Sequence, residues 1–264
     1  MKTCWIIDLG TIGYAEACAL QKRLVAARKA EAVEDVLLFC EHPHVITLGR
    51  NAKQENLLVS EHVLRQKGVE LFESSRGGDV TYHGPGQIVG YPILNLGAIR
   101  RDVVWYVRML EEAMIRATAE YGITTGREPG KTGVWAHAAE HQKELTQSSQ
   151  RTQSSQRRAE ETIKARAKLG AIGVHISRWV TSHGFAYNVS TDLRFFDLIV
   201  PCGIAGCRTT SLEKLLGRSV EESEAKPHIA KHLGELLGLE MKEISRQELF
   251  QKLEHAEQFV PVTA

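Results

Sequence analysis

Apolar residues recur at helical spacing near the start of the chain, and compact apolar runs follow. Four apolar residues between positions 17 and 27 lie three or four residues apart, which predicts an amphipathic helix. The uninterrupted apolar run at 36–40 predicts a buried strand, and residues 87–96, rich in Ile, Val, Tyr and Leu, predict another. Because Pro92 has no N–H for a ladder hydrogen bond, this second strand is expected at a sheet edge or at a bulge.

The clearest helical pattern begins after Asp102, whose side chain is suited to an N-cap. One face stays apolar for five turns, and Gly122 is placed to end the helix. The residues on this face are Val103, Val107, Leu110, Met114, Ala117 and Tyr121. Near the end of the chain, Pro227 is expected to open another helix, and residues 249–253 indicate a short final one.

Two strands are predicted after the middle of the chain, at 171–179 and 185–189, joined by a polar turn at 181–184. Residues 197–206 then run from an apolar strand into a glycine-rich loop. Strands and helices are mixed without strict alternation, which favours an α+β mixed-sheet fold over a doubly wound parallel sheet.

A segment of different composition interrupts this pattern at about 138–166. It has almost no large apolar residue, no Gly and no Pro, and the pentamer Gln-Ser-Ser-Gln-Arg occurs twice, at 147–151 and 153–157. Such a stretch buries too little surface to offset the entropy lost on ordering it. We therefore predict one domain over residues 1–264 that carries a low-complexity surface insertion.

Length, charge and cysteine usage narrow the classes of function. The 264 residues suffice for one large domain, and 33 basic against 32 acidic residues leave a net charge of +1, which gives no global attraction to nucleic acid or anionic membranes. No stretch approaches the roughly 20 apolar residues of a membrane span, and the first residues lack the features of a signal peptide, so a cytoplasmic protein is expected. The five cysteines, at positions 4, 18, 40, 202 and 207, form no C-x-x-C pair, so neither disulfides nor a metal site are predicted.

The densest group of candidate binding residues is Arg76–Gln87, with the sequence Arg-Gly-Gly-Asp-Val-Thr-Tyr-His-Gly-Pro-Gly-Gln. Adjacent glycines admit positive φ and leave amide hydrogens uncovered, which suits a carbonyl, a phosphate or a thioester. A tight turn into the next strand would explain the Gly and Pro residues alone. The polar side chains of Arg76, Thr81, His83 and Gln87 in the same dozen residues favour a binding site.

Cys202 is the candidate nucleophile, because it follows an apolar run and precedes Gly203, an arrangement that exposes a side chain at a strand end. A cysteine attacks as the thiolate and needs a base or a positive charge nearby. The candidate bases are His83, His175, His183 and Lys168. A partly desolvated lysine can lose its proton, so the residue types alone leave the choice between histidine and lysine open.

Four motifs occur in the order typical of one enzyme family. They are Arg76–Gln87, Lys168-x-x-Ala-Ile-Gly-Val174, His183-Gly-Phe-Ala-x-Asn188 and Pro201-Cys-Gly-Ile204, and Glu41-His-Pro and Thr47-Leu-Gly49 match that family's early segment. From about Tyr14 to Leu237, the chain resembles the octanoyltransferases of lipoate biosynthesis. Four ordered motifs make this resemblance specific.

The resemblance implies the α+β fold of the biotin and lipoate protein ligases and a catalytic pair of Cys202 and Lys168. Cys202 would take an octanoyl group from octanoyl-acyl carrier protein as a thioester, and a lysine of a lipoyl domain would then receive it as an amide. Lys168 would accept the protons, while amides near Cys202 and in a turn at 171–173 would hold the oxyanion. No ATP, metal or other cofactor is implied, because the acyl donor is carried on the phosphopantetheine of the carrier protein.

The family's substrate contacts carry over, by resemblance, onto three of the motifs. These residues are Arg76, Gly77, Gly78, Asp79, Val80, Thr81, Tyr82, His83, Ala171, Ile172, Gly173, His183, Gly184 and Phe185. The implied partners are acyl carrier protein and lipoyl-domain proteins, namely the acyltransferase subunits of 2-oxoacid dehydrogenases and the glycine cleavage H protein. No nucleic acid or membrane partner is implied, and a monomer is expected.

The chain departs from the family pattern in two places. The Gln/Ser-rich insertion separates Gly133-Val-Trp135 from Lys168, where the family commonly has a short link, and Gly170 stands where a slightly larger small residue is common. An ATP-dependent lipoate or biotin protein ligase is the alternative, since it shares the fold and an Arg-Gly-Gly segment but needs no nucleophilic cysteine. A relative that binds acyl carriers without turnover is a third reading, which the intact Cys202 and Lys168 argue against.

Overall fold

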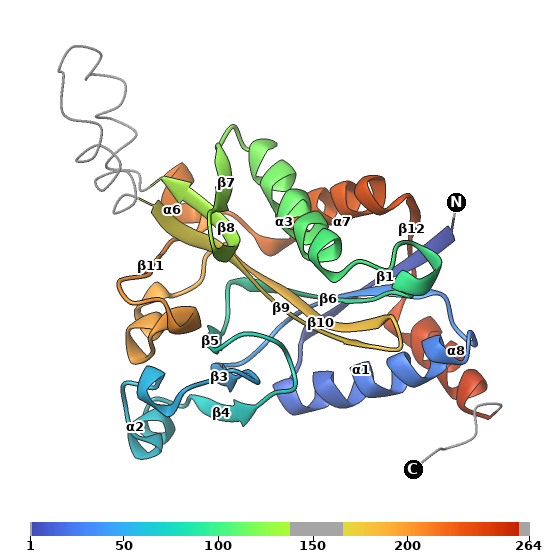
Figure 1. Ribbon diagram of the computed structural model, residues 1–264, viewed down its shortest axis with the longest axis horizontal. Helices are drawn as coiled ribbons and strands as arrows, with labels where there is room; N and C mark the ends of the chain where they lie inside the picture. Colours follow the sequence, from blue (N-terminus) through green and yellow to red (C-terminus); the bar gives the residue numbers. More distant parts are fainter. Residues whose placement is uncertain (1, 138–165, 259–264) are drawn as a thin grey trace.

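A large mixed β-sheet crosses the molecule, and helices pack on both of its faces (Figure 1). The structure, a computed structural model, describes residues 2–137 and 166–258. Its strands are β1 (Lys2–Thr11), β2 (Asp35–Glu41), β3 (Val45–Leu48), β4 (Glu70–Glu73), β5 (Val80–His83), β6 (Gln87–Ile93), β7 (Thr125–Glu128), β8 (Lys131–His137), β9 (Arg166–Ser177), β10 (Val180–Asn188), β11 (Arg208–Thr209) and β12 (Leu239–Glu243). Its helices are α1 (Tyr14–Lys29), α2 (Glu61–Gln66), α3 (Val103–Ala119), α6 (Leu212–Leu216), α7 (Glu222–Leu237) and α8 (Arg246–Glu257), with short 3₁₀ helices at Gln54–Asn56, Leu96–Ala98, Leu193–Leu198 and Pro201–Gly203.

Parallel and antiparallel strand pairs are combined in both sheets of the described residues. The large sheet has the order β12-β1-β2-β6-β10-β9-β8-β7, and β11 pairs with β9. The β1 strand is parallel to β12 and β2, whereas the pairs from β2 through β6, β10 and β9 to β8 are antiparallel. The smaller sheet, β4-β3-β5, also has one parallel and one antiparallel pair. This architecture confirms the predicted α+β mixed-sheet fold.

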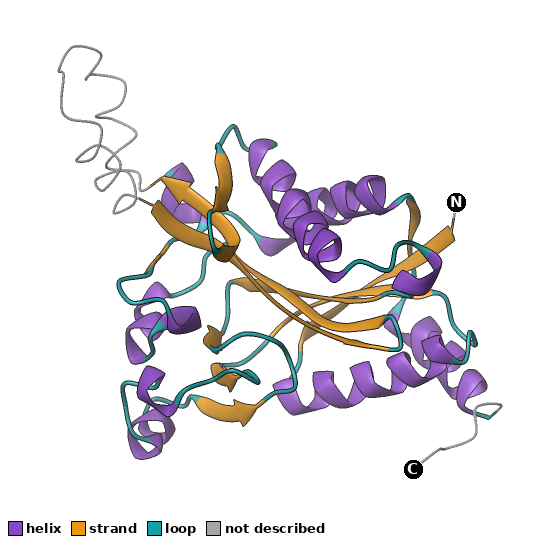
Figure 2. Cartoon of the chain, viewed as in Figure 1, coloured by secondary structure: helices purple, strands orange, loops and turns teal. Residues whose placement is uncertain are grey.

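The two faces of the large sheet are covered by different helices: α3 and α7 pack on one face, and α1 and α8 on the other (Figures 1 and 2). The predicted apolar stripe of α1 is buried. The Asp102 carboxylate accepts a hydrogen bond from the Trp105 main chain at 2.9 Å, which confirms the predicted N-cap of α3. Leu110 and Met114 of α3 are buried as expected, whereas Val103 in its first turn is exposed.

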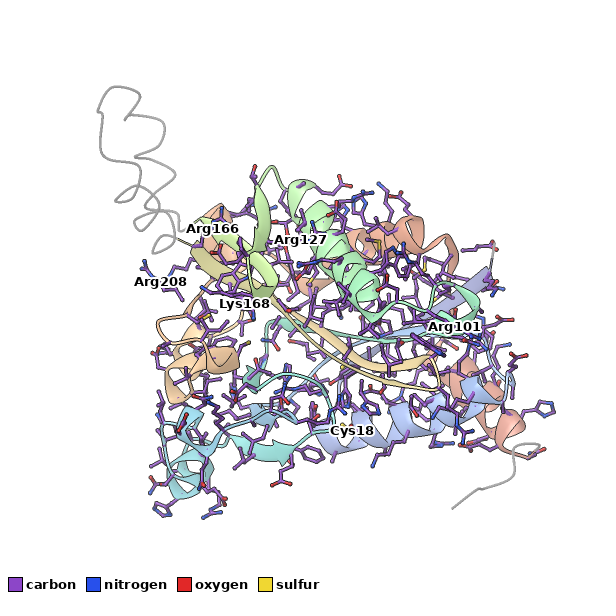
Figure 3. The ribbon with its side chains drawn as sticks, in the orientation of Figure 1. Cys18, Arg101, Arg127, Arg166, Lys168 and Arg208 are labelled. Carbon is purple, nitrogen blue, oxygen red and sulfur yellow. The ribbon has the colours of Figure 1, made fainter. Side chains whose placement is uncertain are left out.

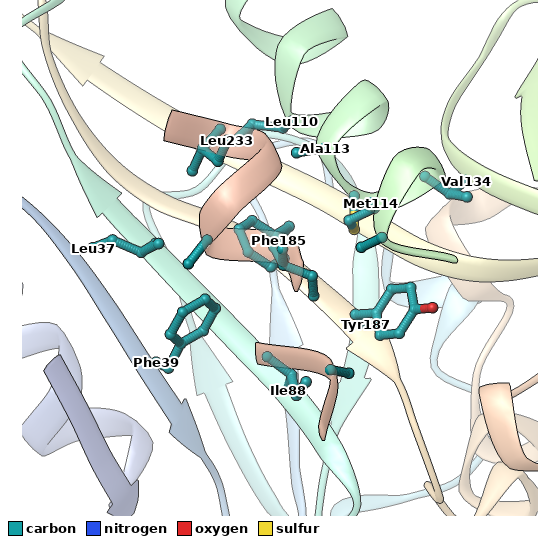
Figure 4. Close-up of a cluster of buried hydrophobic side chains, with 14 of the residues drawn as sticks. Leu37, Phe39, Ile88, Leu110, Ala113, Met114, Val134, Phe185, Tyr187 and Leu233 are labelled. Atoms are coloured by element: carbon teal, nitrogen blue, oxygen red, sulfur yellow. The ribbon is translucent and has the colours of Figure 1, made fainter. Parts of the chain in front are cut away.

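The core under α3 and α7 is a continuous cluster of buried side chains (Figure 4). Phe39, Ile88 and Phe185 reach it from three neighbouring strands, and Met114 reaches it from α3. A Cβ atom on Gly90 would lie 2.2 Å from the Phe185 ring, so the aromatic ring covers a glycine of the adjacent strand. This packing fixes the position of β10, which contributes to the cavity described below.

The β6 strand lies at the centre of the sheet, not at its edge. It pairs with β2 on one side as far as Ile93 and with β10 on the other side as far as Gly90. Pro92 lies beyond the last pair with β10, and the hydroxyl of Thr181 donates a hydrogen bond to its carbonyl oxygen. The predicted edge or bulge is therefore wrong, because the proline is accommodated where the ladder with β10 is interrupted, between Gly90 and the bridge of Asn95 with Val180.

The hairpin between β9 and β10 turns at Arg178 and Trp179, whose φ angles are 51° and 64°. Residues 181–184 belong to β10 and pair with 173–176 of β9, so the predicted polar turn is wrong. The His183 main chain donates a hydrogen bond to the Gln21 side chain of α1 at 2.7 Å. Pairing with β9 and packing against α1 therefore keep this polar segment in the sheet.

Two further elements differ from the sequence prediction, and one agrees with it. The apolar strand predicted at the start of 197–206 is not formed, because Asp197 and Leu198 end the 3₁₀ helix Leu193–Leu198 and Ile199 makes only an isolated bridge with Leu57. The α7 helix begins at Glu222, before Pro227, because Glu221 and Glu224 form a capping box upstream of the proline. The predicted final helix is confirmed by α8.

The predicted insertion at 138–166 lies outside the described residues, except for Arg166, which begins β9. Its two flanks are neighbours, since His137 pairs with Arg166 across the β8–β9 ladder. Among the helices of residues 2–137 and 166–258, none has the length and apolar character needed to cross a membrane.

Candidate active site

A cavity of about 390 Å³ lies where the loop before β5, the strands β9 and β10, and the segment around Cys202 meet. Most of the candidate site residues line it. They are Arg76, Gly77, Gly78, Asp79, Thr81, His83, Lys168, Ala171, Ile172, Gly173, His183, Gly184, Phe185 and Cys202. The fold thus brings together four motifs that are far apart in the sequence.

Some candidate residues lie elsewhere, and other residues enter the cavity without a sequence motif. Val80 and Tyr82 belong to a separate buried cluster under the small sheet, because side chains alternate between the two faces of β5. His175, one of the candidate bases, does not line the cavity either. The lining residues that sequence reasoning did not identify include Tyr14, Val89, Tyr91, Val107 and Lys131.

Lys168 and Cys202 meet at the cavity wall, with 3.0 Å between Nζ and Sγ. Lys168 is only 5% exposed, and its Nζ lies 5.3 Å from the centroid of the Trp135 ring. Figure 3 shows Lys168 on the ribbon close to the start of β9. After Cys202 the chain returns to the same strand, because β11 pairs with Ala167 and Lys168 of β9. This pairing positions the amine and the thiol for proton exchange.

The histidines of the cavity bond to other groups. His83 Nδ1 lies 2.7 Å from Gln87 Oε1, and His183 Nε2 lies 3.0 Å from Ser75 Oγ. Burial lowers the pKa of His83 to about 3, and burial together with the Arg76 charge lowers the pKa of His183 to about 4. Both imidazoles are then neutral and weakly basic at pH 7. The geometry therefore favours Lys168 over these histidines as the partner of Cys202.

A chain of hydrogen bonds runs from His83 to the strand that carries Lys168. Gln87 Nε2 donates to Asn188 Oδ1 at 2.9 Å, so the Gln87 oxygen faces His83 and His83 Nδ1 must be the donor. Asn188 Nδ2 in turn donates to the Thr210 carbonyl at 2.9 Å, and the Thr210 main chain donates to the Lys168 carbonyl at 3.0 Å. These bonds tie the Gly/Pro-rich loop to the catalytic candidate on β9.

Cys202 has a left-handed backbone conformation, with φ 57° and ψ 20°, which is uncommon for a residue other than glycine. The loop around it is held by Asn56 and Asp79. Asn56 Nδ2 donates to Asp79 Oδ2 at 2.7 Å, and a Cβ atom on Gly203 would lie 2.5 Å from that same oxygen. Because the Val200 main chain also donates to the Asn56 carbonyl at 2.8 Å, the loop is fixed on both sides of Cys202.

Two backbone features of the predicted oxyanion site differ from the expectation. The two amides that follow Cys202 donate to the carbonyls of Val200 and Pro201 and so close a tight turn. Residues 171–173 lie inside β9 and not in a turn. The amides of Gly203 and Ile204 are therefore already bonded, and the predicted turn at 171–173 is wrong. That amides near Cys202 and at 171–173 hold the oxyanion stays a prediction.

A buried arginine supplies positive charge to the cavity. Arg76 is 7% exposed; its Nε and Nη2 donate to oxygen atoms of Thr47 at 2.6–3.1 Å, and its Nη1 donates to the Gly77 carbonyl at 3.1 Å. Gly49 permits this close packing, since a Cβ atom there would lie 2.7 Å from Nη1. These acceptors are neutral, so the guanidinium charge is available to an anion in the cavity.

The remaining cysteines are less suited to attack. Burial raises the pKa of Cys4, Cys18 and Cys40, and it raises the pKa of Cys207 to about 11. In the parts of the chain that the structure describes, no group of three or more His, Cys, Asp or Glu side chains is arranged to hold a metal ion.

Comparisons with known proteins agree with the motif pattern. Residues 13–234 match the family model of the lipoyl protein ligase A/B catalytic domain. An octanoyltransferase from Solibacter usitatus is 44% identical over 241 residues, which cover 91% of this chain and 96% of that protein. An octanoyltransferase from Koribacter versatilis is 46% identical over 231 residues, which cover 87% of this chain and 82% of that protein.

Solved structures share the fold at much lower identity. The bipartite lipoate protein ligase of Thermoplasma acidophilum, studied with its E2 lipoyl domain, matches with a TM-score of 0.65 and 15% identity over 100% of this chain and 94% of that one. A lipoate-protein ligase A bound with ATP matches with a TM-score of 0.62 and 14% identity over 99% of this chain and 95% of that one. Likeness at this level establishes the fold alone.

Proposed function

The chain belongs to the lipoyl protein ligase A/B catalytic domain family and to its octanoyltransferases, and on this basis we propose that it moves an octanoyl group from octanoyl-acyl carrier protein to a lysine of lipoyl domains through a thioester on Cys202. The observation that carries the proposal is the distance of 3.0 Å between Lys168 Nζ and Cys202 Sγ at the wall of the cavity. A nucleophile next to a proton acceptor is what acyl transfer through a covalent intermediate requires.

In the first half-reaction, Cys202 attacks as a thiolate. Lys168 Nζ donates a hydrogen bond to Cys202 Sγ, which suits a thiolate beside an ammonium group. A bond forms between this sulfur and the carbonyl carbon, and the bond to the carrier sulfur breaks. The leaving thiolate takes the proton of Lys168, which leaves an acyl-cysteine, a free carrier thiol and a neutral amine. The Arg76 charge stabilises the negative oxygen of the transition state.

In the second half-reaction, the neutral Lys168 serves as the base. The uncharged amine of the acceptor lysine attacks the acyl-cysteine, and Lys168 takes the proton that this nitrogen loses. The carbon–sulfur bond breaks, Cys202 leaves as a thiolate, and the starting pair is restored. Exchange of one thioester for another is nearly balanced, and conversion of a thioester to an amide is downhill. We therefore propose a ping-pong reaction without ATP, metal or other cofactor.

Apolar side chains of the cavity are available to hold the acyl chain. Val89, Val107, Ile172, Phe185 and Ala186 line it together with the reactive pair. Each buried methylene group contributes about 0.8 kcal/mol, so contact along a medium-length chain suffices to select it. We propose that the octanoyl chain lies against these residues.

Both proposed partners are proteins. The donor is acyl carrier protein, and the acceptors are the acyltransferase subunits of 2-oxoacid dehydrogenases and the glycine cleavage H protein. The structural relative from Thermoplasma acidophilum was studied with an E2 lipoyl domain, which supports a lipoyl-domain acceptor. The proposed setting is a monomer in the cytoplasm.

The test is the intact mass of the protein after mixing with octanoyl-acyl carrier protein in the absence of ATP. We expect a single octanoyl adduct, removed by hydroxylamine, on the wild type and on Cys207→Ala, and none on Cys202→Ala. Cys207 is a matched control, because it lies in the same segment and is half-buried like Cys202. Acylation of a lipoyl domain that needs ATP and free octanoate, with no adduct on Cys202, would contradict the proposal and support the ATP-dependent ligase reaction.

A further inference from the structure

The amine of Lys168 is bounded on one side by a glycine that has no room for a side chain. Gly133, in β8, has a φ of 124°, and a Cβ atom there would lie 2.6 Å from Lys168 Cε and 3.3 Å from Lys168 Nζ. It would also lie 2.5 Å from the Gly170 carbonyl oxygen. Because that contact is with backbone, the clash cannot be relieved by the lysine alone. The main chain at Gly133 therefore forms the wall that limits where the amine can lie.

A fully buried carboxylate holds this wall. Glu111 of α3 is 0% exposed, and its Oε1 accepts a hydrogen bond from the Gly133 main chain at 2.9 Å. Its Oε2 accepts from Arg108 at 2.7 Å and from Arg127 at 2.9 Å, two side chains that reach partly into solvent. A buried charge is costly unless it is paired and hydrogen-bonded, and both oxygens of the Glu111 carboxylate accept such bonds.

We propose that Glu111 is a positioning residue for Lys168 and acts through Gly133. The path runs from the carboxylate to the Gly133 main chain, from there to the stem of Lys168, and from its Nζ to Cys202 Sγ. The inference rests on the proposed function, because it assumes that the 3.0 Å contact between Lys168 and Cys202 is the catalytic one. On this inference, a residue of α3, a helix that carries none of the substrate motifs, controls how strongly the Lys168 ammonium group stabilises the Cys202 thiolate.

The adjacent Glu112 offers a matched comparison. Its carboxylate accepts from Arg127 at 2.8 Å and from Arg116 at 3.1 Å, so it shares one arginine with Glu111. Its hydrogen bonds are made on the surface of α3, and Gly133 donates to Glu111 instead. A substitution at Glu112 therefore weakens the same ion-pair network and leaves the wall behind Lys168 in place.

The experiment measures the rate of alkylation of Cys202 by iodoacetamide as a function of pH, in proteins shown to be native by thermal unfolding. Glu111→Gln removes the charge at nearly constant volume, and its single amide oxygen can serve either Gly133 or the arginines, not both. We expect alkylation at pH 7 to slow about fivefold in Glu111→Gln. The charge-assisted hydrogen bond from the Gly133 main chain to residue 111 is weakened, so the backbone at Gly133 can shift and Lys168 can move away from Cys202. Glu112→Gln should alkylate like the wild type.

A second pair of variants tests the wall itself. Gly133→Ala should slow alkylation at pH 7 about tenfold and move the midpoint of the pH profile upward by about one unit, because the new methyl group displaces the ammonium from the thiolate. Gly122→Ala is the control: Gly122 also has a positive φ, of 74°, but a Cβ atom there would meet nothing within 4 Å. It carries the backbone strain without the clash and should leave the profile unchanged.

The outcomes separate this inference from the proposed function. If Lys168→Met slows alkylation and the Glu111 and Gly133 variants do not differ from their controls, the positioning role is overturned and the pair of Cys202 and Lys168 stands. If Lys168→Met alkylates like the wild type, the catalytic pair itself fails. A loss of alkylation in Glu112→Gln equal to that in Glu111→Gln would show that the ion-pair network, and not the contact with Gly133, is responsible.

Discussion

The buried histidines of the cavity should make the protein lose stability as soon as the pH falls below about 6.5. His83 and His183 are each 6% exposed, and their pKa values are lowered to about 3 and about 4 from a value of 6.5 in an unfolded chain. Burial is the main cause for both, with His42 adding to it at His83 and Arg76 at His183. A second proton on either ring would be buried among positive charges.

These pKa values determine how the free energy of unfolding changes with pH. Because both pKa values lie below 6.5 in the folded state, the unfolded chain binds more protons below pH 6.5, and stability falls as the pH falls. At pH 5 both folded histidines are still neutral, so each contributes a loss of about 2 kcal/mol, set by the 1.5 pH units between 6.5 and 5. These two rings together are expected to contribute a loss of about 4 kcal/mol between pH 7.5 and pH 5. The contribution of the two neutral rings to the free energy of unfolding is fully present above about pH 6.5.

Urea unfolding at constant ionic strength, followed by circular dichroism at pH 7.5 and pH 5, measures this difference. His183→Gln should remove about half of the loss, since glutamine can replace the ring Nε2 that contacts Ser75. His83→Asn should remove the other half, since asparagine can replace the Nδ1 that contacts Gln87. His62→Gln, at an exposed position of α2, is the control. If the double variant at 83 and 183 loses as much stability as the wild type, the reasoning about these two rings is refuted.

Two further predictions concern the loop at Cys202 and the acyl chain. Asn56→Ala removes the 2.7 Å hydrogen bond to Asp79, so the free energy of unfolding should fall by about 2 kcal/mol in urea titrations. Octanoylation of Cys202 should also slow several-fold in rapid-quench assays. An unchanged acylation rate would show that the loop at Cys202 does not need this hydrogen bond. Ala186→Leu adds three carbon atoms at the cavity wall and should shift the relative acylation rate from octanoyl toward hexanoyl thioesters about tenfold, whereas an unchanged ratio would place the acyl chain elsewhere.

The meeting of Lys168 and Cys202 shows where sequence reasoning reaches its limit. Each residue could be identified as a candidate from its neighbours in the sequence, but spacing alone could not choose between lysine and histidine as the partner. The choice depends on the pairing of β11 with β9, a contact between distant segments that has no periodicity of its own. Burial then weakens the histidines as bases, and burial is also invisible in a motif.

The wrong turn in the β9–β10 hairpin has a similar cause. Residues 181–184 are polar and include a glycine, which favours a turn. Arg178 and Trp179, which form the turn, are not residue types that favour a positive φ. Strand pairing and the hydrogen bond from His183 to Gln21 overrode the local preference. The burial of Glu111 could not be predicted either, because an acidic residue in an amphipathic helix normally lies on the solvent-facing side. By contrast, the N-cap at Asp102 was predicted correctly, because it depends only on residues in the adjacent turn.

The left-handed backbone at Cys202 also limits which nucleophiles evolution or design could install at this position. Threonine and other β-branched residues are strongly disfavoured at a φ of 57°, so a threonine nucleophile would require the loop to be rebuilt. Serine has no branch at Cβ and keeps an attacking oxygen in the same place. Under the proposed mechanism, a saturation library at position 202 is therefore expected to retain an acyl-enzyme with serine and not with threonine.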